Sequence, residues 1–207
     1  FTIKAGAHIM SVLSGLYKNP IDAMVREYLS NMIDAYTTGN RETPGKYNRP
    51  PIIHLPTRLE STLRFQDFGI GMDYETAWNV YSQYGNSTKG ESNDEVGGFG
   101  LGSKTAFCYN NGAPWNVTTT KNGMTHHFMA FVGENGIPKF THVQSVESDD
   151  PSGVTVSIPI RPTDIREVVS AAHRYIPYFP MELIVEGVAS TDVPKRTTVT
   201  DFKYNGS

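Results

Sequence analysis

The chain has 207 residues, of which 18 are basic and 21 are acidic, and 38% are hydrophobic. This length suits one large domain or two small ones and allows a sizeable buried core. The aromatic content of 11% and the charged content of 19% exclude an intrinsically disordered chain. The net charge of −3 does not indicate nucleic acid or an anionic membrane as the main partner.

A few local features of the sequence indicate the cellular environment of the protein and whether the chain is part of a longer one. No apolar run approaches the roughly 20 residues that a membrane-spanning helix needs. The single cysteine, Cys108, cannot form an internal disulfide and favours a reducing, intracellular environment. The chain starts at Phe1 without an initiator methionine or a signal peptide. We therefore expect the N-terminal part of a longer soluble protein.

The first predicted element is a long helix that begins at Pro20. Asn19 is a favourable N-cap residue, and proline suits the first helical position. Apolar residues recur at helical spacing from Ile21 to Tyr36, and Gly39 is expected to end the helix. The following elements are predicted as strands over 52–55 and 62–65, a turn over 67–72, a helix over 75–84, a mobile loop over 85–94 and a helix over 105–109.

The second half of the chain is predicted to be rich in strands. Alternating patterns indicate strands over 115–120, 126–132, 137–143, 154–160 and 182–186, with one helix over 164–175. The aromatic residues Phe128, Phe131, Tyr175 and Tyr178 fit core positions. The pattern predicts an α+β fold, a two-layer sandwich with helices on one face of a mixed, mostly antiparallel sheet. Residues 1–207 are expected to form a single domain.

Three polar residues of the first helix form a candidate site. Glu27, Asn31 and Asp34 fall within roughly 60° of one another on a helical wheel, nearly opposite the apolar stripe. The default interpretation of such residues is a solvated polar face of the helix. The functional interpretation is that a carboxylate accepts a proton from water, while an amide oxygen one turn away ligates Mg²⁺.

The predicted turn over 67–72 is a second candidate site. It reads Asp67-Phe68-Gly69-Ile70-Gly71-Met72 and follows a strand directly. A tight turn with an exposed aspartate is one interpretation. The other is that the carboxylate accepts a hydrogen bond from an exocyclic amine such as that of adenine, and the glycines let the backbone approach the base.

A glycine-rich segment before the 105–109 helix is a third candidate site, suited to phosphate. Four glycines occur within residues 97–102, and free backbone N–H groups that lead into a helix attract anions. The Walker pattern does not fit, because Ser103 rather than glycine precedes Lys104. The dinucleotide fingerprint lacks its strand–helix–strand context.

The order and identity of the three segments resemble the GHKL ATPase superfamily. Glu27-x3-Asn31-x2-Asp34, then Asp67-x-Gly69-x-Gly71, then the glycines of 97–102 match its motifs in sequence. The superfamily includes the gyrase B subunit, the ninety-kilodalton heat-shock chaperone, bacterial histidine kinases and MutL. Within it, the segments 25–35 and 91–104 look most like the phage rIIA-type protectors from prophage-induced early lysis.

The resemblance implies a Bergerat ATP-binding fold with ATP and Mg²⁺ as ligands. It assigns Glu27 as the general base, Asn31 as the Mg²⁺ ligand and Asp34 as a support of the nucleotide pocket. Asp67 would accept the adenine amino group. The base pocket would be shaped by Gly71 and Met72, and the phosphates would be wrapped by Gly98, Phe99, Gly100, Leu101 and Gly102.

The resemblance also implies a mobile element and two candidate cations near the phosphates. The segment 85–96 would be an ATP lid, and Lys104 or Lys89 would reach phosphate. Members of the superfamily often carry glycine-threonine on a late strand, where this chain has Gly153-Val154-Thr155. Thr155 serves as the candidate support of the adenine site after a local shift, although strand alternation points it to the opposite face.

The function that the resemblance implies is Mg²⁺-dependent ATP binding and slow hydrolysis to ADP and phosphate, coupled to lid closure and protein association. The expected partners are ATP, a second copy or a larger complex, and a host or membrane-associated protein; nothing points directly to nucleic acid. The expected location is the host cytoplasm or the periphery of the inner membrane. The alternative is a nucleotide-gated interaction module without significant turnover, because nothing after Gly187 resembles the lysine segment that gyrase-like members recruit. A purely structural domain would need three coincident motifs.

Overall fold

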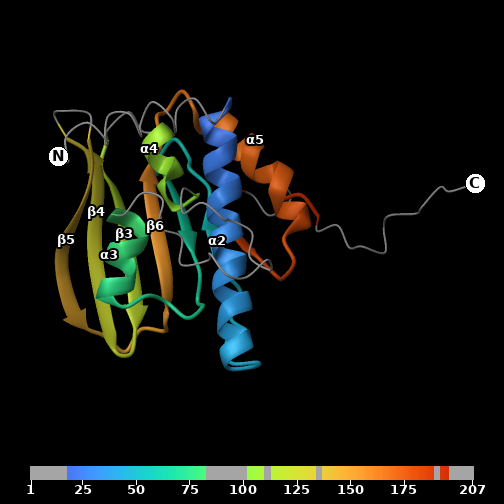
Figure 1. The fold of residues 1–207 in the computed structure, drawn as a ribbon. Helices are drawn as coiled ribbons and strands as arrows, with labels where there is room; N and C mark the ends of the chain where they lie inside the picture. The colour runs from blue at the N-terminus through green and yellow to red at the C-terminus, as the bar shows by residue number, and fades with distance from the viewer. Residues whose placement is uncertain (1–17, 83–101, 110–112, 134–136, 189–191, 196–207) are drawn as a thin grey trace, which may run out of the picture.

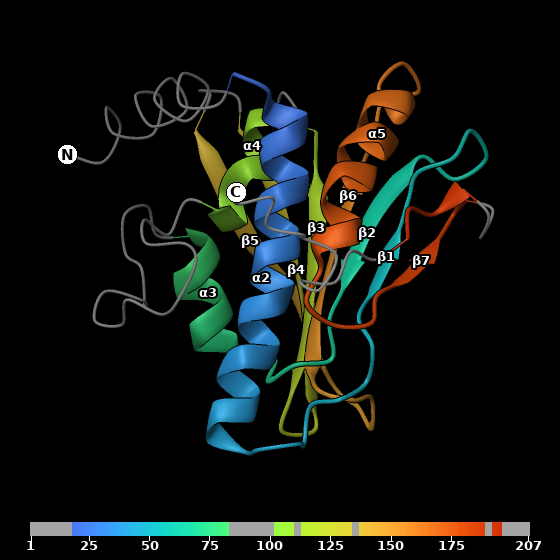
Figure 2. The same ribbon diagram turned by 90° about the vertical axis from the view of Figure 1, so that its right-hand side faces the viewer.

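The computed structural model describes residues 18–82, 102–109, 113–133, 137–188 and 192–195. Seven strands form one sheet in the order β5-β4-β3-β6-β2-β1-β7, and the helices lie against one face of it (Figures 1 and 2). Only the β1–β7 pair is parallel among the described strands. The predicted two-layer α+β architecture is confirmed. No helix in the described part of the chain is long and apolar enough to cross a membrane.

The bounds of the elements agree with the predicted order. The strands are β1 (Ile52–His54), β2 (Thr62–Gln66), β3 (Trp115–Lys121), β4 (Met124–Val132), β5 (Pro138–Glu147), β6 (Gly153–Pro159) and β7 (Ile184–Glu186). The α-helices are α2 (Pro20–Glu42), α3 (Tyr74–Ser82), α4 (Thr105–Tyr109) and α5 (Ile165–Tyr175), and the 3-10 helices are η1 (Gly102–Lys104) and η2 (Ile176–Tyr178).

Helix α2 lies along the middle of the sheet and begins where the sequence predicts. The side chain of Asn19 accepts a hydrogen bond from the Asp22 N–H at 2.9 Å, which caps the helix. The prediction that Gly39 ends the helix is wrong, because the helix continues to Glu42. A Cβ atom on Gly39 would lie 2.6 Å from the Tyr47 ring. The glycine is therefore explained by close packing rather than by helix termination.

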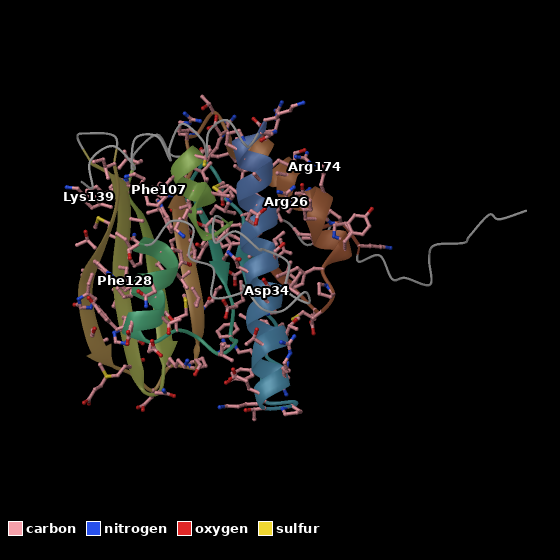
Figure 3. The ribbon with its side chains drawn as sticks, viewed as in Figure 1. Arg26, Asp34, Phe107, Phe128, Lys139 and Arg174 are labelled. Carbon is pink, nitrogen blue, oxygen red and sulfur yellow. The ribbon has the colours of Figure 1, made fainter. Side chains whose placement is uncertain are left out.

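The core lies between α2 and the sheet and is centred on aromatic rings. The Trp115 ring is fully buried, with the Phe107 ring centroid at 5.3 Å and the Tyr28 ring centroid at 6.3 Å. Phe107 and Phe128 both lie on the helical side of the sheet in Figure 3. Of the aromatic residues predicted as core, Tyr178 is 64% exposed, because the short η2 helix buries Ile176 instead.

The turn over 67–72 is packed between α2 and β3 by its two glycines. A Cβ atom on Gly69 would lie 2.8 Å from the Cβ atom of Ala35 on α2. Gly71 has a φ of +62°, and a Cβ atom there would lie 2.0 Å from the Thr120 carbonyl oxygen on β3. The backbone of this loop is therefore fixed from both layers of the fold.

We predict that Gly71→Ala destabilises the domain more than Gly123→Ala. Both glycines have positive φ, so each alanine pays about 1 kcal/mol of backbone strain. Only the Gly71 variant also pushes a methyl group into a backbone carbonyl, since nothing lies within 4 Å at Gly123. Urea unfolding should show a loss of about 3 kcal/mol or more for Gly71→Ala and about 1 kcal/mol for Gly123→Ala. Equal losses would contradict the close approach at Gly71.

Candidate functional site

The three polar residues of α2 share one side of the helix and are half-buried. Glu27, Asn31 and Asp34 are all of intermediate exposure, and the Glu27 side chain is 19% exposed. Glu27 Oε1 lies 2.9 Å from Arg26 Nη2. Figure 3 shows Arg26 and Asp34 along the same helix. This side of α2 is thus partly covered by other parts of the chain rather than fully solvated.

The first and third motifs meet at Glu27. A Cβ atom on Gly102 would lie 2.6 Å from Glu27 Oε2, so the carboxylate lies directly against the start of η1. The Tyr28 hydroxyl donates to the Ser103 carbonyl oxygen at 2.8 Å and ties η1 to α2. Several residues assigned to the phosphate end lie outside the described part of the chain. They are Lys89, the rest of the lid segment 85–96, and the four motif residues Gly98, Phe99, Gly100 and Leu101.

The second motif provides a buried carboxyl group at the end of β2. Asp67 is only 6% exposed, and its Oδ1 accepts a hydrogen bond from the Gly69 N–H at 2.9 Å. Burial raises the pKa of Asp67 to about 7, against the opposing effect of backbone hydrogen bonds from Gly69 and Val154. A carboxyl group that is so little exposed to water is a strong acceptor for a ligand N–H group.

Two hydroxyl groups that the sequence analysis did not single out hold this loop. The Tyr36 hydroxyl accepts from the Phe68 N–H at 3.0 Å. The Thr119 hydroxyl accepts from the Met72 N–H at 2.7 Å. Tyr36 looked like one more apolar position of the helical stripe. For Thr119, the only indication in the sequence was that a polar residue occupies a position of β3 that strand alternation assigns to the buried face.

The register of β6 places Thr155 away from the helical layer. Thr155 is paired with Gln66 and Thr118, and all three side chains line a polar pocket of about 420 Å³ on the face without helices. Its neighbour Val154 packs against the core and is paired with Thr119. The fold contains no shift in β6 that turns Thr155 toward the helices, as strand alternation indicated. Asp67 lines the same pocket, and the assignment of Thr155 to the adenine site stays a prediction.

Lys104 is buried and contacts helix α3 in this structure. Its Nζ donates to the Val80 carbonyl oxygen at 2.8 Å, near the C-terminal end of α3. Burial lowers the pKa of Lys104 to about 8. A cation at a helix C-terminus is favourable for the helix. The observed contact is structural, and a contact between Lys104 and phosphate stays a prediction.

Residues 12–149, about two thirds of the chain, match the family described as "Histidine kinase-, DNA gyrase B-, and HSP90-like ATPase". The chain therefore belongs to this ATPase family, which supports ATP binding by the domain. The match does not distinguish among the branches of the superfamily. No curated protein sequence matches the chain.

We predict that Asp67 makes the domain less stable as the pH rises from about 4 to 7. Because its pKa is higher in the folded state than the ordinary value of 3.8, the folded state binds this proton more tightly than the unfolded state. The contribution to stability is full below about pH 4 and is lost as the pH passes through 7. Asp67→Asn cannot ionise, so its melting temperature relative to wild type should increase between pH 5 and pH 8.

The matched control for this measurement is Asp150→Asn, which changes an exposed carboxylate. Its melting temperature should follow that of wild type across the same pH range. Parallel curves for wild type and Asp67→Asn would show that Asp67 does not have a raised pKa in the folded domain.

Proposed function

We propose that the domain binds Mg-ATP and hydrolyses it slowly to ADP and phosphate. The observation that carries this proposal is the position of the Glu27 carboxylate against Gly102, where the glycine-rich segment enters η1. A segment of this composition suits phosphate, because its backbone N–H groups are free to face an anion. A carboxylate at that point can accept the proton of a water molecule that attacks the terminal phosphate.

The two oxygens of Glu27 have different surroundings that suit this role. Oε1 is held by Arg26 at 2.9 Å, while Oε2 lies toward Gly102. The ion pair fixes the orientation of the carboxylate at one oxygen, and the other oxygen is the one directed to the phosphate segment. In this proposal Glu27 is the general base, and the adjoining backbone of 98–102 surrounds the phosphates.

A single protein ligand for Mg²⁺ fits the residues present. Asn31 lies one turn after Glu27 on α2 and is half-buried. Among the described residues, no group of three or more His, Cys, Asp or Glu side chains could hold a metal ion. Mg²⁺ is usually bound through one or two protein oxygens together with waters and substrate phosphates, and it neutralises phosphate charge. We therefore propose that Asn31 ligates the ion and that Asp34 supports the same side of the pocket.

The base is recognised at the other end of the site in this proposal. Asp67 accepts the adenine amino group, and Gly71 and Met72 shape the pocket beside it. The burial of the Asp67 carboxyl and its position in the lining of a pocket of about 420 Å³ support this role. Glu27 lies at the phosphate end of α2, and Ala35, which packs against Gly69, lies at the base end. The two residues are eight helical positions apart, which corresponds to about 12 Å along the helix.

We predict that Glu27→Gln abolishes most ATP hydrolysis while it leaves ATP binding nearly unchanged. Loss of a general base lowers turnover by about 100-fold or more, whereas the amide keeps the size of the side chain. Phosphate release and calorimetric Kd for Mg-ATP check the two parts separately. Glu42→Gln, at the exposed C-terminal end of α2, is the matched control and should behave as wild type. Equal turnover in Glu27→Gln and wild type would refute the catalytic role.

The second candidate function is a nucleotide-gated interaction module without significant turnover. The burial of Lys104 favours it, since its ammonium group contacts the Val80 carbonyl oxygen on α3 at 2.8 Å. In either case we propose that bound ATP orders the lid and promotes a homodimer or larger complex. Association that requires ATP in wild type, with phosphate release no higher than in Glu27→Gln, would favour the module over the ATPase.

The biological setting is proposed from the motif resemblance alone. The segments 25–35 and 91–104 support an rIIA-like phage protein that acts in the host cytoplasm or at the periphery of the inner membrane. Pull-down of host proteins with wild type and with the nucleotide-binding variant Asp67→Asn tests this setting. Loss of a specific host partner in the variant is the expected result, and the absence of any partner for wild type would count against it.

A further inference from the structure

We propose that Tyr36 and Thr119 form a hydroxyl clamp, a pair of positioning residues that hold the 67–72 loop at both ends and so set the discrimination for adenine at Asp67. This inference rests on the proposed function, because it concerns how the same site recognises its base. Neither residue belongs to the three motifs. The clamp joins the helical layer and the sheet across the loop, from α2 on one side and from β3 on the other.

Tyr36 fixes the first peptide after the carboxyl group. Its ring is buried on α2, and its hydroxyl accepts from the Phe68 N–H at 3.0 Å and donates to the Arg49 carbonyl oxygen at 2.6 Å. The Arg49 guanidinium in turn lies 3.7 Å from the centre of the Phe68 ring. Phe68 is therefore held at its backbone and at its side chain, directly next to Asp67.

Thr119 fixes the other end of the loop. It is fully buried on β3, and its hydroxyl accepts from the Met72 N–H at 2.7 Å and donates to the Met72 carbonyl oxygen at 2.9 Å. In the sheet, Thr119 is paired with Val154, whose carbonyl oxygen accepts from the Asp67 N–H at 2.9 Å. The Thr119 hydroxyl thus connects Met72, at the end of the loop, to strand β3, and the neighbouring strand β6 binds the backbone of Asp67 at the beginning of the loop.

The clamp matters for base recognition because the loop between its two ends contains two glycines. Gly69 and Gly71 have no side chains to hold this segment, so its position depends on the close packing of its backbone and on the hydrogen bonds at its two ends. A hydrogen bond between an amine and a carboxyl group weakens steeply when its distance or angle changes. The clamp holds the loop without contacting the phosphate end of the site, where Glu27 meets Gly102. Its loss should therefore reduce discrimination for the base more than affinity for the triphosphate.

The test compares two nucleotides that differ only in the adenine amino group. Calorimetry measures the Kd of Mg-ATP and of the Mg²⁺ complex of purine riboside triphosphate, which lacks the amine, for wild type, Tyr36→Phe, Thr119→Val and Thr119→Ser. The ratio of the two Kd values reports the amine contact alone. Two matched controls lose hydroxyl groups away from this loop. Thr163→Val removes an exposed hydroxyl that contacts Asp164, and Tyr109→Phe removes a buried tyrosine's hydroxyl that contacts the same residue.

Wild type should prefer ATP by roughly tenfold or more. In Tyr36→Phe and Thr119→Val this preference should fall by at least about threefold, while the Kd of purine riboside triphosphate changes little. Thr119→Ser, which keeps the hydroxyl, should restore the preference, and both controls should retain it. Tyr36→Phe tests the clamp independently if Thr119→Val does not fold.

The two ways of failing are distinguishable. A full preference for ATP in folded Tyr36→Phe or Thr119→Val, with wild type also selective, would overturn the clamp and leave the proposed function intact. No binding of either nucleotide to wild type would overturn the proposed function itself. Equal binding of both nucleotides to wild type would overturn recognition of the amine by Asp67, and with it the clamp.

Discussion

The burial of the Asp67 carboxyl group is the constraint on which the rest of the site depends. An ionisable group away from water destabilises the fold unless donors satisfy it. Here the Gly69 N–H provides one donor at 2.9 Å, and the remaining cost raises the pKa to about 7. The loop can come this close to the carboxyl and to α2 only because Gly69 has no side chain. A ligand that donates a hydrogen bond to this carboxyl therefore offsets part of the desolvation free energy of the buried group.

Helix α2 connects the parts of the site, because different turns of it contact different motifs. Glu27 and Tyr28 contact η1, while Ala35 and Tyr36 contact the loop after β2. A single rigid helix thus sets the separation between the phosphate end and the base end. The apolar positions that pack on the sheet fix the rotation of the helix, and this rotation determines which polar residues are half-buried and which face solvent.

The sequence could predict the order of elements and the three motifs because these depend on local patterns. Helical spacing, strand alternation and glycine placement are properties of neighbouring residues, and the capping of α2 by Asn19 was predictable for the same reason. Gly39 was misinterpreted as a helix end, since its role is to admit the Tyr47 ring from outside the helix. The exposure of Tyr178 likewise depends on which residues of η2 face the core.

Contacts between distant residues could not be predicted from pattern alone. Tyr36 and Phe68 are 32 positions apart, and Thr119 and Met72 are 47 positions apart. Tyr36 resembled the other apolar positions of its helix and Thr119 resembled the neighbouring threonines of its strand, and only the fold brings the two hydroxyl groups to the loop. Lys104 was assigned to phosphate by its position after the glycines, and the sequence alone could not show that its side chain contacts Val80 on α3. The alternation of β6, in contrast, correctly indicated that Thr155 points away from the helical layer.

Calorimetric titration of Mg-ATP into wild type, Asp67→Asn and the control Asp149→Asn, which changes an exposed carboxylate outside the pocket lining, is the most direct test of the central claim. In Asp67→Asn the Gly69 N–H engages the amide oxygen, so the amide NH₂ group would face the adenine amine as a second donor. We expect saturable binding by wild type and by Asp149→Asn, and a loss of affinity of about tenfold or more in Asp67→Asn. Equal affinity in all three proteins would contradict the account that the buried carboxyl group of Asp67 recognises the base.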